Sequence, residues 1–202
     1  YGRFRGPLHR NESARPPFPA STPLPRTRKF GDLDVSEPIA DALQAMGYHT
    51  PTPIQTRVIP ALLNGKDVVG QAQTGTGKTA AFGIPLAESI DTRHAGVQGV
   101  ILTPTRELAV QVTGELGHIG QHRGIRVVAI YGGQNIERQI RDLRGGVPIV
   151  VGKPGRMLDH LGRGTLNLGS VRTAILDEAD EMLDIGFADD IEAILRHIPA
   201  ER

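Results

Sequence analysis

Short apolar segments alternate with amphipathic segments along most of the chain. Runs rich in β-branched residues predict strands at 67–70, 99–103, 126–130, 148–151 and 171–176. Apolar positions three and four residues apart predict helices at 36–46, 53–63, 78–89, 106–119, 136–143, 155–161 and 187–197. Apolar strands that alternate with helices predict an α/β fold in which helices cover both faces of one parallel sheet.

Composition places the chain among globular proteins. Of its 202 residues, 39% are hydrophobic and 22% are charged, which is typical of a soluble domain. The absence of cysteine excludes disulfides and thiol catalysis. No apolar run approaches the roughly 18 residues that a membrane span needs, and the start has no apolar signal core, so a cytoplasmic protein without membrane contact is expected.

Charge separates an N-terminal arm from the rest. Residues 1–29 contain seven Lys or Arg residues, a single acidic residue, Glu12, and many prolines, with no apolar periodicity. This composition predicts a disordered basic arm followed by one folded domain at 30–202. Two interpretations of the arm stay open: a solubilising linker, or a segment that attracts RNA.

A glycine-rich motif between a predicted strand and a predicted helix indicates a nucleoside triphosphate site. Glycines at this position let backbone N–H groups surround a phosphate chain, a lysine reaches the β and γ phosphates, and a hydroxyl ligates Mg²⁺. The residues concerned are Thr74, Gly75, Thr76, Gly77, Lys78 and Thr79. A plain strand-to-helix turn is the structural alternative.

Acidic residues directly after the last predicted strand complete this pattern. Asp177 follows the apolar run 171–176, so it emerges at the carboxyl end of a strand, where open α/β sheets bind ligands. An acidic helix start that complements the helix dipole is the alternative interpretation of Asp177, Glu178 and Asp180.

Several motifs in one order carry a resemblance to a known family. The chain resembles the first RecA-like domain of the DEAD-box RNA helicases, P-loop NTPases, over roughly residues 30–202. The resemblance rests on Phe30 with the segment 47–55, then on 72–79, 104–109, 132–133, 154–156 and 177–180.

The resemblance implies ATP as the nucleotide. Gln55 matches the glutamine that recognises adenine, and its carboxamide has the donor and the acceptor that adenine N6 and N7 require. Phe30 matches an aromatic residue that stacks on the base, with a core anchor as the alternative. Thr50 stands where many members have Arg or Lys, so a second group that covers adenine is missing here.

The resemblance also implies roles in hydrolysis. Asp177 would hold Mg²⁺ together with Thr79, and Glu178 would act as the base that activates water. Lys78 would act on the phosphates. Asp180 matches an aspartate that couples the motifs and takes no part in the chemistry.

Three short motifs would bind the sugar-phosphate backbone of RNA without reading its sequence. Each follows a strand and precedes a helix, a geometry that suits phosphates, although each alone is more typical of a plain turn. Their residues are Pro104, Thr105, Arg106, Gly132, Gly133, Lys153, Gly155 and Arg156. Lys153 replaces the usual threonine and is expected to contact an RNA phosphate, with a solvent-exposed lysine as the alternative. Glu107 is an alternative ion-pair partner for Arg106.

Together these features predict part of an ATP-dependent RNA helicase that uses ATP and Mg²⁺, binds single-stranded or structured RNA, and works with a second RecA-like domain. Alone, the chain is expected to bind its ligands but hardly to turn over. Two alternatives are a DNA translocase domain and an ATP-dependent RNA clamp or scaffold. The histidines form no recognisable metal-ligand cluster.

Overall fold

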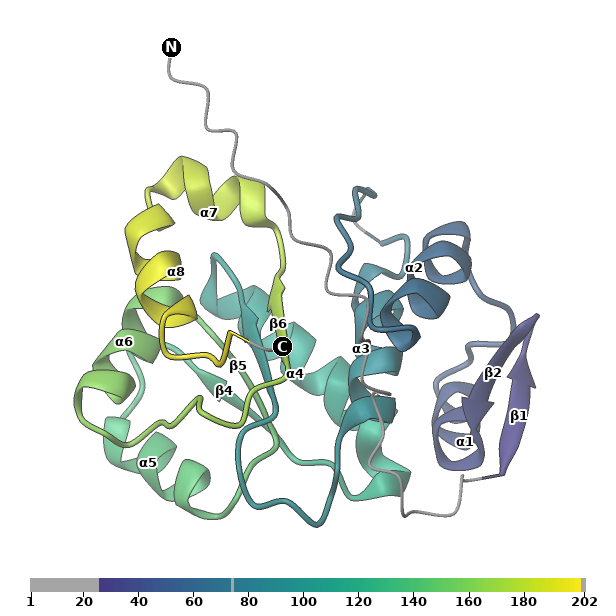
Figure 1. The fold of residues 1–202 in the computed structure, drawn as a ribbon, viewed down its shortest axis with the longest axis horizontal. Helices are drawn as coiled ribbons and strands as arrows, with labels where there is room; N and C mark the ends of the chain where they lie inside the picture. The colour runs from purple at the N-terminus through teal and green to yellow at the C-terminus, as the bar shows by residue number, and fades with distance from the viewer. Residues whose placement is uncertain (1–25, 74, 201–202) are drawn as a thin grey trace.

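The computed structural model describes residues 26–73 and 75–200 and contains two sheets. An antiparallel hairpin pairs β1 (Thr27–Phe30) with β2 (Leu33–Ser36). The main sheet contains β3 (Gly99–Leu102), β4 (Val127–Ile130), β5 (Ile149–Gly152) and β6 (Thr173–Leu176). Its strands are all parallel, in the order β4-β5-β3-β6. Figure 1 shows the hairpin at one end of the molecule, away from the main sheet.

Helices connect and flank these strands. The hairpin is followed by α1 (Glu37–Ala45) and α2 (Pro53–Leu63). The remaining helices are α3 (Lys78–Ser89), α4 (Arg106–Gly120), α5 (Ile136–Arg144), α6 (Pro154–Gly162), α7 (Ala179–Ile185) and α8 (Ala188–Leu195). The predicted parallel α/β fold is therefore confirmed.

Each face of the main sheet has its own hydrophobic core. Ile101 of β3 belongs to a buried cluster with Ile84 of α3 and Leu116 of α4. Its neighbours Val100 and Leu102 belong to a second cluster with residues of α6 and α8. Because successive strand side chains point to opposite faces, helices cover both sides of the sheet.

The strand predicted at 67–70 is absent from the structure. This segment has no regular structure, and the Val69 side chain is fully exposed. Only two apolar residues, Val68 and Val69, stand between Asp67 and Gly70, and in a strand they would point to opposite faces. Neither face gains enough burial to fix the segment, so β6 remains an edge strand of the described sheet.

The folded part of the chain begins earlier than predicted. Residues 27–29 were expected to be disordered, but they form β1. Lys29 forms an ion pair with Asp34 at 2.9 Å, and Arg28 forms one with Asp41 at 2.5 Å. Residues 1–25, the rest of the predicted arm, lie outside the described residues. Helix α7 was expected only under the alternative interpretation of the acidic residues as a helix start, and it has Asp180 and Glu181 in its first turn.

Candidate functional site

Backbone hydrogen bonds align the predicted motifs at the carboxyl edge of the main sheet. The Asp177 N–H donates to the Leu102 carbonyl at 3.0 Å, and the Thr103 N–H donates to the Gly152 carbonyl at 3.0 Å. The Lys153 N–H donates to the Ile130 carbonyl at 3.1 Å. Pairing thus extends one residue past each strand end. The residues that follow the four strands therefore lie side by side along one edge of the sheet. This row contains Asp177, the segment 103–106, Lys153 and the start of the loop after β4.

The phosphate loop turns at its glycines, as predicted. Gly75 and Gly77 have φ values of 80° and 85°, which favour glycine. The Thr76 hydroxyl donates to the Gln73 carbonyl at 2.7 Å. Helix α3 begins at Lys78, so the N–H groups of its first turn are directed at the loop, where an anion can accept them. Thr74 lies outside the described residues, so its predicted role stays a prediction.

Gln55 connects helix α2 to the phosphate loop. Its side chain is completely buried. The Gln55 Nε2 donates to the Gly77 carbonyl at 3.1 Å, and its Oε1 accepts from the Thr52 N–H at 2.9 Å. In this conformation the carboxamide positions Gly77. Adenine recognition by Gln55 stays a prediction, since it requires the carboxamide to exchange these bonds.

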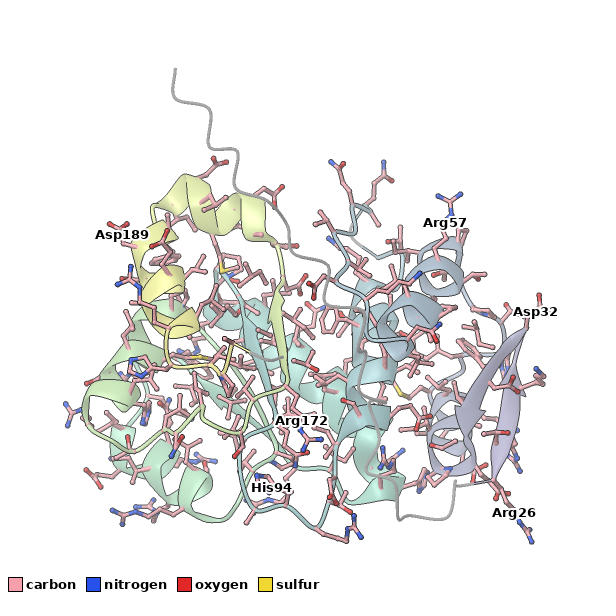
Figure 2. The ribbon with its side chains drawn as sticks, in the orientation of Figure 1. Arg26, Asp32, Arg57, His94, Arg172 and Asp189 are labelled. Carbon is pink, nitrogen blue, oxygen red and sulfur yellow. The ribbon has the colours of Figure 1, made fainter. Side chains whose placement is uncertain are left out.

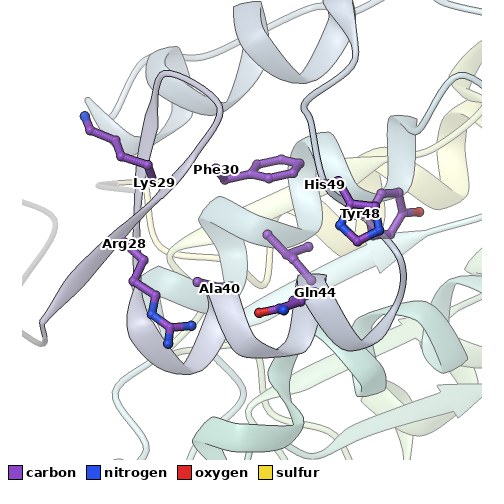
Figure 3. A pocket seen from close by; sticks show the side chains of 8 residues that line it. Arg28, Lys29, Phe30, Ala40, Gln44, Tyr48 and His49 are labelled. Atoms are coloured by element: carbon purple, nitrogen blue, oxygen red, sulfur yellow. The ribbon is translucent and has the colours of Figure 1, made fainter.

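Phe30 is part of the core between the hairpin and α1. Only 3% of the residue is exposed, which favours the core-anchor alternative, and adenine stacking stays a prediction. Its ring lines a cavity of about 160 Å³ (Figure 3). The other lining residues are Arg28, Lys29, Ala40, Leu43, Gln44, Tyr48 and His49. Both cations of this cavity, Arg28 and Lys29, already form ion pairs.

Asp177 is a buried carboxylate beside the start of α3. Burial raises the pKa of Asp177, the positive charge of Lys78 opposes this shift, and the negative charge of Glu178 adds to it. The charge of Lys78 therefore acts on the Asp177 carboxylate, although the two residues are 99 positions apart in the sequence. A carboxylate that burial destabilises in this way suits a cation ligand.

Glu178 has a strained backbone. Its φ is 53°, and it is the only non-glycine residue with a positive φ in the described ranges. The left-handed conformation costs about 1–2 kcal/mol for such a residue. It turns the chain from β6 into α7, so Asp177 and Glu178 leave the strand end in different directions. Strain of this kind concentrates at functional sites.

Arg106 lies over an aromatic ring. Its guanidinium carbon is 5.0 Å from the centre of the Tyr131 ring, and the ion pair with Glu107, the alternative interpretation, is absent from the described residues. The Thr105 Oγ1 accepts from the Leu108 N–H at 3.2 Å and caps α4. The Thr105 hydroxyl keeps its own proton, which a phosphate oxygen can accept. Pro104 is buried beside it.

The loops after β4 and β5 present exposed glycines. Gly132, Gly133 and Gly155 are exposed, and Gly133 has a φ of 79°. Arg156, in the first turn of α6, lies 4.0 Å from Asp159. The Lys153 Nζ lies 5.5 Å from the centre of the Phe187 ring, so the ammonium has a partner that neither sequence interpretation included.

Sequence reasoning missed three residues of the site. Tyr131 and Phe187 hold the cations Arg106 and Lys153. Glu181 lies three residues after Glu178 in the same turn of chain, and its interaction with the Glu178 carboxylate raises the pKa of Glu181. The spacing of three residues between Glu178 and Glu181 is a helical signal that could have identified this pair. Nothing in the sequence pairs the two aromatic residues with their cations, because they are 25 and 34 positions away.

The described residues contain neither a preformed cluster of metal ligands nor a helix that could cross a membrane. No group of three or more His, Cys, Asp or Glu side chains in 26–73 and 75–200 is arranged to hold a metal ion. No described helix combines the length and the apolar character that crossing a membrane requires.

Asp180, predicted to couple the motifs, is exposed in the first turn of α7, and this role stays a prediction.

Similarity to known proteins agrees with the motifs. The family described as DEAD/DEAH box helicase matches residues 52–202. The chain is 56% identical over 173 residues to a DEAD-box ATP-dependent RNA helicase CshA of Geobacillus kaustophilus, covering 86% of this chain and 37% of that protein. It is 54% identical to an ATP-dependent RNA helicase CshA of Listeria monocytogenes, covering 86% and 34%. The chain thus spans about a third of the length of these curated relatives.

Solved structures show the same fold. A DEAD box protein from the hyperthermophile Methanococcus jannaschii superposes with a TM-score of 0.82 at 46% identity, over 88% of this chain and 49% of that one. A hypothetical ATP-dependent RNA helicase from Sulfolobus tokodaii superposes with a TM-score of 0.75 at 41% identity, over 82% and 48%. The second comparison covers less of this chain but leads to the same fold.

Proposed function

We propose that this chain, which belongs to the DEAD/DEAH box helicase family, is the ATP- and RNA-binding part of an ATP-dependent RNA helicase. The observation that carries the proposal is the row at the carboxyl edge of the main sheet. It brings Asp177 next to the turns that precede α4 and α6, while Lys78 acts on the Asp177 carboxylate. The proposed site for the ATP phosphates and the proposed site for the RNA backbone then lie at the same edge of the main sheet.

The ATP phosphates bind at the start of α3. The N–H groups of the first helical turn and the turns at Gly75 and Gly77 surround the β phosphate, and Lys78 neutralises the β and γ phosphates. Glu178 accepts a proton from the attacking water. Glu178 leaves the strand end in a different direction from Asp177, which supports separate roles for the two carboxylates.

Magnesium fits the residues at this site. Among the described residues, Lys78 is the cation whose charge lowers the pKa of the buried Asp177 carboxylate, and Thr79 lies in the first turn of α3. We assign Asp177 and Thr79 as the groups that hold Mg²⁺. When bound, Mg²⁺ would offset the negative charge of the phosphate oxygens.

RNA binds to the loops that follow β3, β4 and β5. Arg106, Lys153 and Arg156 provide charge, and the exposed Gly132, Gly133 and Gly155 let a phosphate approach the backbone. These contacts reach the sugar-phosphate backbone and not the bases, so binding is independent of sequence.

The complete protein needs more than this chain. We expect a second RecA-like domain to supply charge for phosphoryl transfer, because such arginines contribute about 10³ to 10⁵ in rate where they have been measured. The chain alone is expected to bind but hardly to hydrolyse ATP. A cytoplasmic location belongs to the same proposal and is supported by the absence of cysteine.

ATP hydrolysis by the complete protein tests the proposal. We expect single-stranded RNA to stimulate hydrolysis and single-stranded DNA of the same length to stimulate it far less. Equal stimulation by DNA would favour a DNA translocase. RNA binding that depends on ATP but proceeds without hydrolysis would favour a clamp. Lys78→Ala should abolish nucleotide binding in each case.

The basic arm adds RNA affinity. Residues 1–25 of the predicted arm contain four arginines and one glutamate, and a deletion that stops there keeps every residue of β1. We expect deletion of residues 1–25 to reduce the dependence of RNA affinity on salt, by about 0.7 in log–log slope for each lost phosphate contact, with unchanged ADP affinity. An unchanged slope would identify the arm as a solubilising linker.

A further inference from the structure

A buried polar network connects the loops that we assign to RNA. Gln139 of α5 and His160 of α6 are 1% and 0% exposed. The Gln139 Nε2 donates to the Tyr131 carbonyl at 2.9 Å and to the Gln134 Oε1 at 3.0 Å. The Gln139 Oε1 lies 3.0 Å from the His160 Nε2, and the His160 Nδ1 lies 2.8 Å from the Thr165 Oγ1.

The acceptors in this network fix its proton positions. The Tyr131 carbonyl can only accept, so the Gln139 amide group must face it, and the Gln139 Oε1 must face His160. The His160 Nε2 therefore carries a hydrogen and donates it. Burial is the largest effect that lowers the pKa of His160, and the charge of Arg156 adds to it. With the ring neutral, the single Thr165 hydroxyl proton is shared between two acceptors, the His160 Nδ1 at 2.8 Å and the His160 carbonyl at 3.1 Å.

Both ends of the network lie in protein segments that we assign to RNA binding. Tyr131 precedes Gly132 and Gly133, and its ring lies under Arg106. His160 lies four residues after Arg156 in α6, on the same face of that helix. A continuous set of contacts thus runs from Arg106 through Tyr131 and Gln139 to the helix that begins at Pro154.

We propose that Gln139 and His160 are positioning residues that hold the loop 131–134 and helix α6 in one arrangement, so that their two RNA contacts act together. This inference rests on the proposed RNA function. Neither side chain touches RNA, since both are buried. They act through the Tyr131 carbonyl and through the face of α6 that carries Arg156.

Substitutions in the complete protein test this role. We expect Gln139→Leu and His160→Phe each to weaken binding of a fluorescent single-stranded oligouridylate about three- to tenfold, the range that one or two lost hydrogen bonds predict. Because the residues form one unit, the double variant should bind no more weakly than the worse single variant. His160→Gln, which keeps a donor near the Nε2 position, should recover most of the affinity.

A matched control separates positioning from general destabilisation. Gln98 is also a buried glutamine, with bonds to the Asp91 N–H and the Asp91 carbonyl. It lies at the amino end of β3, near His94, which Figure 2 shows at the edge of the molecule opposite α7. Gln98→Leu should lower the melting temperature by a similar amount without changing RNA affinity.

Kinetics provides a second readout. In the RNA-stimulated ATPase, the Gln139 and His160 variants should raise the half-saturating RNA concentration three- to tenfold and leave the rate at saturating RNA unchanged. Wild-type affinity in Gln139→Leu and His160→Phe would overturn the inference, and so would an equal loss of affinity in Gln98→Leu. Failure of the unmodified protein to bind the oligouridylate would instead overturn the proposed function.

Discussion

The two halves of the candidate site differ in how firmly the fold holds them. The phosphate side follows a segment, 66–71, that is exposed and irregular, and the Gln55 Nε2 bond to the Gly77 carbonyl connects the phosphate loop to α2. On the RNA side, backbone bonds extend the strand pairing into the loops, and the network of Gln139 and His160 lies beneath them. The RNA side is preorganised, whereas the phosphate side is less fixed.

This contrast separates motif strength from structural order. The phosphate loop is the strongest motif of the sequence because its glycines and its lysine specify chemistry. The same glycines and the exposed Val68 and Val69 provide little burial to fix it. The short RNA motifs are weak patterns, but they directly follow buried strands, which fix their positions. We expect nucleotide to order the phosphate side and RNA to find its side already formed.

The largest effect should come from Glu178→Gln, which removes the proposed base from the acidic motif. The rate of RNA-stimulated ATP hydrolysis in the complete protein should fall about 10²- to 10⁴-fold, the usual contribution of a general base. Binding of Mg·ATP and RNA should persist, because neither requires the proton transfer. Normal turnover in a steady-state phosphate-release assay would show that Glu178 is not the base.

Gly77→Ala should disrupt the phosphate side while the RNA side remains intact. A Cβ at Gly77 would collide with the Gln55 Nε2, and alanine disfavours the φ of 85°. ADP affinity, measured by calorimetry, should fall at least about tenfold, since each 1.4 kcal/mol of strain corresponds to that factor. Affinity for RNA in the absence of nucleotide should not change.

Gly65→Ala is the matched control for this substitution. Gly65 has a φ of 69°, but no atom of residues 26–73 or 75–200 lies within 4 Å of the Cβ that alanine would add. It therefore carries the same backbone strain without the contact to Gln55. If Gly65→Ala lowers ADP affinity equally, strain alone explains the effect, and the positioning role of Gln55 is wrong.

Asp177→Asn should stabilise the nucleotide-free chain. Burial raises the pKa of Asp177 above its value in the unfolded chain, so stability is lost as pH rises through these two values and the buried carboxyl ionises. Asparagine removes this loss. At neutral pH the variant should gain about 1 kcal/mol, a typical gain from relieving an active-site strain, and melt roughly 2–4 °C higher.

The pH and the ligand dependence check the assignment of Asp177. Without ligand, the stability advantage of Asp177→Asn should shrink as the pH falls toward the unfolded pKa of aspartate. Mg·ADP should reverse the order, because only the carboxylate holds the cation. A variant that melts lower than the wild type at neutral pH without ligand would contradict the burial argument.

The sequence predicted the main fold well because burial on both faces leaves a clear pattern. The strand at 99–103 and the helix at 106–119 appear within one residue as β3 and α4. The strand predicted at 67–70 was wrong, because two valines flanked by polar and glycine residues do not specify a buried strand. Hairpin β1 and β2 was missed because its exposed positions carry charges that resemble a disordered arm.

Candidate site residues could be named from the sequence where a motif fixes the residue type. Lys78 stands in a glycine-rich motif that suits phosphates, while the roles of Asp177 and Glu178 come from the family resemblance, and all three roles stay predictions. Gln139 and His160 were not predictable, because a buried glutamine and a buried histidine look like ordinary helix positions until their partners are known. Lys153 shows the same limit, since its ring partner Phe187 comes from a distant turn.

The smallest effects concern Lys153, where the two sides of the site meet. Phe187 lies between α7 and α8, so the Lys153 ammonium over its ring contacts the segment that follows the acidic residues 177–180. We expect the ring to orient the ammonium toward an RNA phosphate. Such a contact contributes about 0.5–1 kcal/mol, so Phe187→Leu should weaken RNA binding only two- to fivefold and leave the salt slope unchanged.

Lys153→Thr, which removes the phosphate contact itself, should make the log–log slope of RNA affinity against salt shallower by about 0.7. If Lys153→Thr keeps the original salt slope and lowers the melting temperature as much as Phe187→Leu does, the lysine only packs on the Phe187 ring and does not contact RNA.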